Sequence, residues 1–390
     1  MIEAKAFYRK VELLLEGMSG EPSPRRFAEA LLPRLMERLG EGLKLRGVQL
    51  YQRDHGGRFR LIRSEGTVAP DLSDELTRRA SREGGADIGE LPWSGRTAAG
   101  ATGLMALPDL GELVVALLFD GPDGGPELIT QIQSVIAALQ YAVEQHLRRR
   151  ELEDLFEQAR AIQLSLLPSS APRFGEFDIA AVSIPARRVG GDFYDFLPVD
   201  EDTLALAVAD ASGHGLPAAL QARDVATGLR MGVERDLKIT RTVEKLSRVI
   251  HRSGLASRYI SMFFGELELN GNLSYINAGH PPGLLLDDRG VHELTVGGML
   301  LGPQGDATYK LGFTHVDRGA ALALYTDGVT ERGTGESEPF GPQRLAEWLR
   351  DWREGPSQAG VDDLISRLRM HGPTRTFEDD VTVIFVRRPR

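Results

Sequence analysis

A stretch without helix-breaking residues dominates the organisation of this chain. Residues 127–167 contain neither glycine nor proline, and Pro126 and Pro168 flank them. Both residue types are unfavourable inside helices, so this stretch predicts one helix of about 41 residues and about 60 Å. The helix divides the chain into an N-terminal part, residues 1–126, and a C-terminal part, residues 169–390.

Apolar residues recur along this helix at alternating spacings of four and three, which is typical of a coiled-coil seam. Three arginines and an acidic run, residues 148–154, separate two blocks. The blocks are Leu128, Ile132, Val135, Leu139 and Ala142, and then Leu152, Leu155, Ala159, Ile162 and Leu166. We expect residues 127–168 to form a signalling helix and residues 127–167 to hold a homodimer. The alternative that the helix packs only on its own domains stays open.

The N-terminal part, residues 1–126, has the pattern of a separate α/β domain. Helical patterns cover about residues 6–15, 27–39 and 72–81, and strand-like runs cover 47–51, 59–63 and 113–119. This order, followed by a long helix, resembles a GAF sensory domain. Residues 1–150 contain no asparagine and no cysteine. Their absence excludes the N-K-F-x-D-E cyclic-nucleotide signature and a thioether-linked bilin, and the ligand stays open.

Four short acidic motifs mark the C-terminal part as the place of chemistry. At Asp192, Asp210 and Asp327 an aspartate meets a glycine turn or the end of an apolar run, and Asp379 and Asp380 open a last strand-like run. The motifs are GGDFYD at 190–195, DASGHG at 210–215, TDG at 326–328 and EDDVT at 378–382. Strand ends are where side chains from distant sequence converge. Converging carboxylates repel one another, by about 4 kcal/mol per pair at a separation of about 4 Å and an effective dielectric near 20. A shared site therefore predicts hard divalent cations, Mg²⁺ or Mn²⁺.

The secondary-structure pattern of residues 169–390 indicates an α+β fold. Strand-like runs and helical patterns come in blocks rather than in strict alternation, which favours antiparallel sheets with flanking helices. The strand-like runs are 177–184, 203–209, 260–269, 273–277, 320–325 and 381–386, and the helical patterns are 216–233, 240–253, 342–352 and 360–370.

Composition excludes several classes of protein. The chain has no cysteine, which rules out disulfides, thiolate metal sites and a cysteine-dependent phosphatase. A net charge of −10 argues against nonspecific nucleic-acid binding. The longest strongly apolar run, residues 113–119, is too short to span a membrane, and the N-terminus lacks the pattern of a signal peptide. We therefore expect a cytoplasmic protein without nucleic-acid or membrane partners.

Six motifs follow one another in the chain: QLSLLP at 163–168, PARRVGGDFYD at 185–195, VADASGHGLPAAL at 208–220, NAGHPPG at 277–283, LYTDGVTER at 324–332 and EDDVTVI at 378–384. Together, in this order, they resemble the SpoIIE-like branch of the metal-dependent protein phosphatase (PPM, type 2C-like) superfamily. The resemblance implies an α-β-β-α sandwich and hydrolysis of phosphoserine or phosphothreonine on a protein. It also implies a small STAS-domain anti-anti-sigma factor as substrate, within a partner-switching pathway.

The same resemblance implies a set of site residues. Asp192, Asp210, Asp327 and Asp379 would hold two divalent metal ions, with Asp210 between them. The backbone carbonyl of Ala211 would complete one coordination shell, a role that does not depend on the side chain. Asp380 would support the site from the position beside the ligand, and which of Asp379 and Asp380 coordinates directly stays open.

Basic residues near these motifs are weaker candidates. Arg187 and Arg188 precede the Gly-Gly-Asp turn, and their guanidinium groups could bind phosphate, although the sequence favours two solvated surface arginines. His214 and His280 are candidates for protonating the leaving oxygen, although either can be a structural turn histidine.

Two alternative functions stay open at this point. One is a non-catalytic sensor or scaffold that binds a signalling partner. The other is a diguanylate cyclase, because Gly190-Gly191-Asp192 resembles the Gly-Gly-Asp-Glu-Phe loop of that family. In this chain Phe193 replaces the required glutamate, so the phosphatase interpretation is favoured.

Overall fold

The computed structural model describes most of the chain as two compact units. Described are residues 24–67, 70–82, 93–97, 100–107, 112–119, 126–233, 238–253, 259–333 and 338–390, with residues 9, 11, 13–15 and 18. The units are Met1–Asp154 and Leu155–Arg390. Helix α4 (Pro126–Leu164) runs through the boundary between them and ends three residues before the predicted position. The division into 1–126, 127–168 and 169–390 stays a prediction.

The N-terminal unit contains an antiparallel five-stranded sheet in the order β2-β1-β5-β4-β3. Its strands are β1 (Leu45–Arg53), β2 (Phe59–Gly66), β3 (Trp93–Thr97), β4 (Gly100–Leu107) and β5 (Leu113–Phe119), and its helices include α2 (Pro24–Leu43) and α3 (Ser73–Arg82). Strands β3 and β4 were not predicted, because their small residues lack an alternating apolar pattern. The GAF-like assignment stays a prediction. Of the predicted helix at 6–15, the structure describes residues 9, 11 and 13–15, and all are helical.

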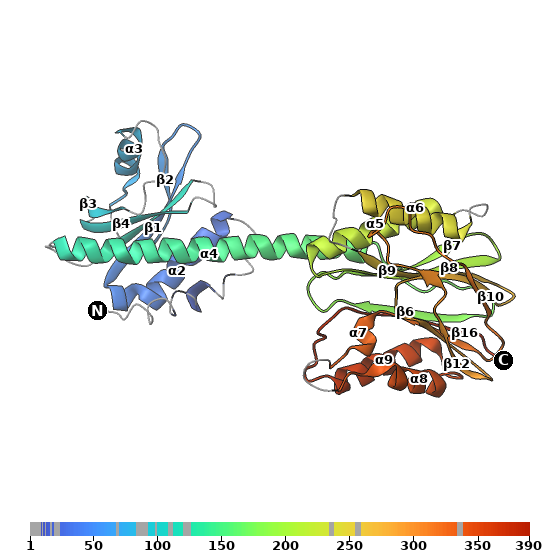
Figure 1. Ribbon diagram of the computed structural model, residues 1–390. Helices are drawn as coiled ribbons and strands as arrows, with labels where there is room; N and C mark the ends of the chain where they lie inside the picture. The colour runs from blue at the N-terminus through green and yellow to red at the C-terminus, as the bar shows by residue number, and fades with distance from the viewer. Residues whose placement is uncertain are drawn as a thin grey trace. The chain divides into compact units, whose positions relative to one another are not determined.

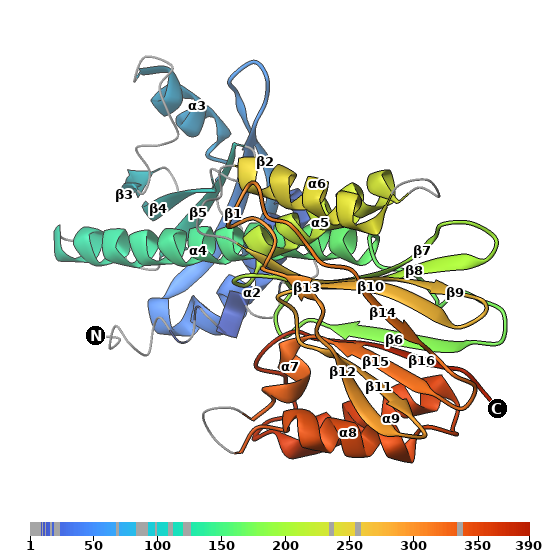
Figure 2. The same ribbon diagram turned by 45° about the vertical axis from the view of Figure 1, so that its right-hand side comes forward.

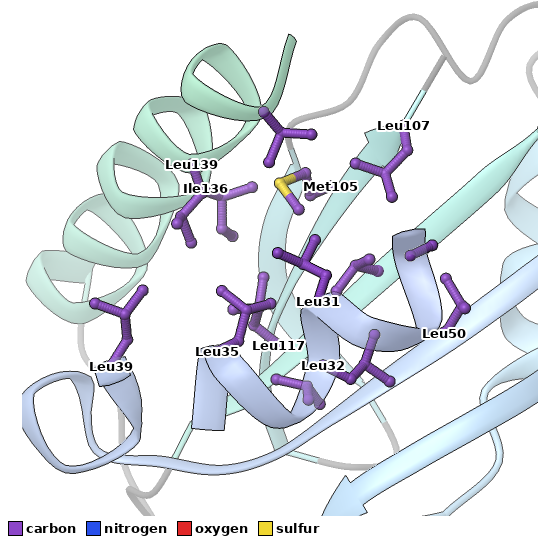
Figure 3. Packing of buried hydrophobic residues seen from close by; sticks show 14 of the residues in the cluster. Leu31, Leu32, Leu35, Leu39, Leu50, Met105, Leu107, Leu117, Ile136 and Leu139 are labelled. Atoms are coloured by element: carbon purple, nitrogen blue, oxygen red, sulfur yellow. The ribbon is translucent and has the colours of Figure 1, made fainter. Parts of the chain in front are cut away.

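Helices α2 and α4 pack on this sheet and bury an apolar core. Figure 3 shows Leu35 of α2, Met105 of β4, Leu117 of β5 and Ile136 of α4 in one cluster. Gly103 of β4 permits the close approach of α4, because a Cβ atom there would lie 1.7 Å from Cδ1 of Ile136.

The two apolar blocks of α4 have different environments. Ile132 and Leu139, in the first block, are buried in the core of the N-terminal unit. Leu155 and Ile162, in the second block, are 54% and 60% exposed. The first block therefore packs within its own domain, as one of the two alternatives expected. Of the described apolar side chains in these two blocks, those of the second block are the more exposed in the single chain.

Two stacked sheets with helices on both outer faces form the C-terminal unit (Figures 1 and 2). One sheet has the order β13-β10-β9-β8-β7, with β14 beside β10, and the other has the order β12-β11-β15-β16-β6. All strand pairs are antiparallel except the short pair β10–β13. The strands are β6 (Asp178–Ile184), β7 (Asp192–Pro198), β8 (Thr203–Ala211), β9 (Ile260–Glu268), β10 (Asn272–Ala278), β11 (Gly283–Asp287), β12 (Gly290–Leu294), β13 (Gly297–Gly298), β14 (Gly312–His315), β15 (Ala321–Tyr325) and β16 (Val381–Arg387).

Separate apolar clusters join the layers of this unit. Residues such as Phe263 of β9 and Ile384 of β16 fill the space between the sheets. Helices α5 (Leu216–Gly232) and α6 (Ile239–Arg252) pack on the outer face of the first sheet. Helices α7 (Asp327–Thr330), α8 (Gly341–Asp351) and α9 (Ser357–His371) pack on the outer face of the second. The predicted α-β-β-α sandwich is confirmed.

One local expectation needs correction. The sequence suggests that Asp192 is part of a glycine turn, but Asp192 is the first residue of strand β7 and directly follows Gly190 and Gly191.

None of the described helices is both long and apolar enough to cross a lipid bilayer.

Candidate metal centre

Neighbouring strands bring the first two aspartates together. The antiparallel register of β7 and β8 sets Asp192 directly opposite Asp210. Side chains opposite one another on such strands have Cβ atoms about 5 Å apart. The two carboxylates therefore share one end of the first sheet.

The second sheet delivers the remaining acidic residues to the same place. Asp327 begins α7 just after β15, and Asp379 and Asp380 precede β16, which pairs with β15. The hydroxyl of Thr326 crosses between the sheets and donates a hydrogen bond of 2.7 Å to Oδ2 of Asp192. Sequence reasoning missed Thr326, although it stands beside Asp327 in the TDG motif.

Burial and mutual repulsion raise the pKa values of these carboxylates. Burial raises the pKa of Asp192 well above its usual range, and Asp210 and Asp380 raise it further. Burial also raises the pKa of Asp210 to about 7, with added repulsion from Asp327, Asp379 and Asp380. The pKa of Asp327 rises to about 6 through burial and the charge of Asp379, and burial raises the pKa of Asp379 as well. A cation would stabilise the ionised forms of this set.

Asp380 uses both carboxylate oxygens to hold the backbone. Oδ1 accepts a hydrogen bond of 2.8 Å from the Ala186 amide, and Oδ2 accepts one of 2.6 Å from the Gly191 amide. Gly190 permits this contact, because a Cβ atom there would lie 2.3 Å from Oδ2 of Asp380. Oδ1 of Asp379 accepts a hydrogen bond of 2.8 Å from the backbone amide of Asp380, the next residue. The geometry favours Asp379 for direct coordination and Asp380 for support.

The carbonyl of Ala211 lies beside the same carboxylates. A Cβ atom on Gly191 would be 2.6 Å from the Ala211 oxygen and 3.3 Å from Oδ1 of Asp210. The Ala211 amide also donates to the Gly191 carbonyl at 3.2 Å. Glycine at position 191 thus leaves room for an oxygen-rich site.

The end of helix α4 contacts the loop that carries these residues. The side-chain Nε2 of Gln163 donates a hydrogen bond of 2.6 Å to the Gly190 carbonyl, and its Oε1 accepts one of 3.1 Å from the Gly190 backbone amide. The sequence contained Gln163 within the QLSLLP motif, but only the fold shows that it binds the residue two positions before Asp192.

The basic candidates differ in position. Nη1 of Arg187 lies 3.1 Å from Nδ1 of His214, and both residues oppose the rise in the pKa of Asp379. Arg188 instead lies over the ring of Phe156, at 6.0 Å. His280 is buried, with Nδ1 2.7 Å from the Ser261 hydroxyl.

Charge and burial also separate the two histidines. Burial lowers the pKa of His280 to about 3, so this ring is neutral near pH 7. Its amide donates to Oδ1 of Asn277 at 2.8 Å, which fits a structural role in the turn. His214, which is exposed beside Arg187, is the better placed of the two for contact with a substrate.

The donors suit a hard cation, although they do not form a finished coordination shell. Among the described residues, no group of three or more acidic or histidine side chains is gathered closely enough to hold an ion as it stands. The converging atoms are all carboxylate and carbonyl oxygens, which Mg²⁺ and Mn²⁺ prefer. The larger hollows, of about 610 and 660 Å³, are lined by residues outside this set.

Comparison with known proteins agrees with the fold and the motifs. Residues 200–389 match the family model of stage II sporulation protein E, SpoIIE. The C-terminal unit is also similar in fold to the SiaA-PP2C domain of Pseudomonas aeruginosa, with a TM-score of 0.55 and 22% identity over 61% of this chain and 97% of that one. This family match rules against the diguanylate cyclase alternative.

Two curated relatives match parts of the chain. Phosphoserine phosphatase RsbU of Bacillus subtilis is 32% identical over 196 residues, which cover 49% of this chain and 58% of RsbU. Protein IcfG of Synechocystis is 32% identical over 289 residues, which cover 66% of this chain and 44% of IcfG. The chain spans about half the length of these relatives.

Proposed function

The C-terminal domain of this chain belongs to the SpoIIE family of PP2C-type phosphatase domains, and on that premise we propose that the protein is a metal-dependent serine/threonine protein phosphatase. One observation carries the proposal. Asp192 and Asp210 at the end of one sheet lie near Asp327 and Asp379, which flank strands of the other sheet, and burial and mutual repulsion raise the pKa values of these carboxylates.

Phosphatases of this family depend on divalent metal ions. In this chain Asp192, Asp210, Asp327, Asp379 and the Ala211 carbonyl would hold two ions, Mn²⁺ or Mg²⁺, and Asp210 would contribute to both. Such ions, when bound, lower the pKa of water toward neutrality and neutralise charge on a phosphoryl group. Asp380 and Thr326 hold the ligands in place through the hydrogen bonds described above.

We assign two further polar residues, Arg187 and His214, to contacts with the substrate. Arg187 is exposed beside Asp379 and binds the phosphate group through its guanidinium. His214, in contact with Arg187, is the residue that protonates the leaving serine oxygen. His280 keeps a structural role, because burial holds it neutral.

The substrate that we propose is a phosphoserine on a STAS-domain protein of a partner-switching pathway. A relative with 32% identity carries the name phosphoserine phosphatase, which supports serine as the phosphorylated residue. The N-terminal unit would act as a GAF-like sensor. Helix α4 would transmit its state, since Gln163 near the end of that helix binds Gly190 beside the proposed metal ligand Asp192.

Two substrates test this function. Purified protein should release phosphate from p-nitrophenyl phosphate and from a serine-phosphorylated STAS-domain protein, in both cases only with Mn²⁺ or Mg²⁺. Binding of the STAS-domain protein without hydrolysis of either substrate would favour the scaffold alternative instead. Hydrolysis of p-nitrophenyl phosphate alone would keep the phosphatase assignment and reject this substrate class.

A further inference from the structure

Arg332 is a buried cation that the functions proposed above do not use. It follows α7, the short helix that begins with Asp327, and its side chain is 1% exposed. Moving a guanidinium out of water is costly, so the groups around it must compensate for its lost hydration. Arg332 lies five residues after Asp327, a proposed metal ligand, so the groups that it binds bear on the geometry of the site.

The guanidinium of Arg332 fastens the segment that leads to Asp379. Its donors reach three backbone carbonyls and one carboxylate: Leu368 at 3.0 Å, Thr376 at 2.7 Å, Thr374, and the side chain of Glu378. Three of these four partners belong to residues 374–378, directly before the acidic pair.

Close packing adds to these hydrogen bonds. The guanidinium lies 5.0 Å from the centre of the Phe377 ring. Gly372 lies against it as well, because a Cβ atom at position 372 would be 2.0 Å from Cζ of Arg332. The φ angle of Gly372 is −80°, which any residue can adopt, so glycine is required there for space.

These contacts connect two proposed ligands that are 52 residues apart in the sequence. Asp327 begins α7, and Arg332 is the second residue after that helix ends. Asp379 directly follows Glu378. We propose that Arg332 is a positioning residue that sets the placement of Asp379 relative to Asp327 and thereby the affinity for the divalent ion. The inference rests on the proposed metal-dependent function.

The chain offers a closely matched control in Arg388. This arginine is 10% exposed, binds the Glu176 carboxylate at 2.5 Å, and donates to the carbonyls of Asn270 at 2.7 Å and Val316 at 2.9 Å. It also lies 5.4 Å from the centre of the Phe177 ring. Arg388 follows the end of β16 that is opposite to the acidic pair, about 26 Å from Asp380 along the strand direction.

The experiment compares Arg332→Met with Arg388→Met in the full-length protein. Free Mn²⁺ is measured by electron paramagnetic resonance during titration, and the stability of the metal-free protein is measured by thermal unfolding. We expect both variants to be less stable than the wild type. Only Arg332→Met should also raise the Mn²⁺ dissociation constant, by about 10- to 100-fold, as is typical when a partner of a metal ligand is lost.

Two further variants keep the test decisive. Arg332→Lys retains the charge without the planar fork and should recover only part of the affinity. Gly372→Ala displaces the guanidinium without removing it and should weaken Mn²⁺ binding in the same direction, even if Arg332→Met fails to fold.

Three outcomes would overturn the inference. Wild-type Mn²⁺ affinity in folded Arg332→Met or Gly372→Ala is one, and equal weakening in Arg332→Met and Arg388→Met is another. If the wild-type protein binds Mn²⁺ no better than Asp210→Asn, the proposed metal centre itself is wrong, and the positioning role is rejected with it.

Discussion

The side-chain amide of Gln163 forms two hydrogen bonds with the backbone of Gly190, one as donor and one as acceptor. Gln163 belongs to the last turn of α4, and Gly190 is followed by Gly191, whose amide binds Asp380. A displacement of this helix end would therefore act on the backbone that leads into Asp192. Through this contact, α4 would act as a signalling helix if it has two positions that hold Gly190 differently.

We expect Gln163→Ala to lower Mn²⁺ affinity or turnover in the full-length protein, because the Gly190 amide and carbonyl lose partners that hold the loop. Gln158→Ala, at an exposed position of the same helix, is the matched control. The measurement is turnover of p-nitrophenyl phosphate as a function of Mn²⁺ concentration. If the two variants behave alike, helix α4 is a passive tether.

Asp210→Asn and Asp327→Asn should each abolish metal-dependent hydrolysis while the protein stays folded. Each change removes a ligand charge from the site and leaves a side chain of similar size. Phosphate release at micromolar Mn²⁺ measures the loss of activity, and circular dichroism measures whether the variants stay folded. Near wild-type turnover in both variants would contradict the two-ion assignment.

The contribution of Asp210 and Asp327 to the stability of the metal-free protein should fall as the pH rises from about 4 to about 7. The pKa of Asp210 is about 7 and that of Asp327 about 6 in the folded state, both above the value of about 4 in an unfolded chain. The folded state therefore binds more protons in this range, and deprotonation weakens it. Above pH 7 this contribution levels off.

Thermal unfolding in EDTA checks this dependence by comparing Asp210→Asn with the wild type. The gain in melting temperature of the variant over the wild type should increase between pH 5 and pH 7.5. Saturating Mn²⁺ should reverse the sign of the difference at pH 7.5, because only the wild type keeps the full ligand set. A gain that does not change with pH would show that the charge of Asp210 is compensated by other groups.

Leu155→Glu combined with Ile162→Glu should weaken a homodimer. Both side chains are more than half exposed in the single chain, and burying apolar surface contributes about 25 cal/mol per Å². Sedimentation equilibrium should show dissociation at higher protein concentration for the double variant. Met370→Glu, at an exposed apolar residue of α9, is the control. An unchanged dimer would move the interface away from the second block of α4.

Sequence reasoning predicted the elements that rest on strong local patterns. The apolar runs of β8, β9 and β16 and the helices α5, α6, α8 and α9 all lie where the pattern indicated. Strands such as β4 and β7 were missed, because glycines or acidic residues interrupt the alternation on which such predictions depend. The same limit explains why Asp192 was expected in a turn.

The sequence by itself determined the chemistry that this chain can offer. The absence of cysteine, the order of the acidic motifs and the long stretch without glycine or proline are all properties of composition and spacing. The absence of cysteine and the acidic motifs indicate oxygen ligands, the motif order indicates the family of the domain, and the long stretch indicates a connecting helix. These conclusions need only the residue types and their spacing along the chain.

Only the tertiary structure showed which distant groups hold the predicted site residues in place. The bond from Thr326 to Asp192 spans 134 residues, and the bonds of Asp380 to Ala186 and Gly191 span 194 and 189. Such contacts depend on strand register and on how the two sheets stack, which are set by packing across the whole domain. No local pattern encodes a partner so distant. The hydrogen bond of Thr326 and the backbone partners of Asp380 are therefore visible only in the folded structure, although the resemblance already implied a supporting role for Asp380.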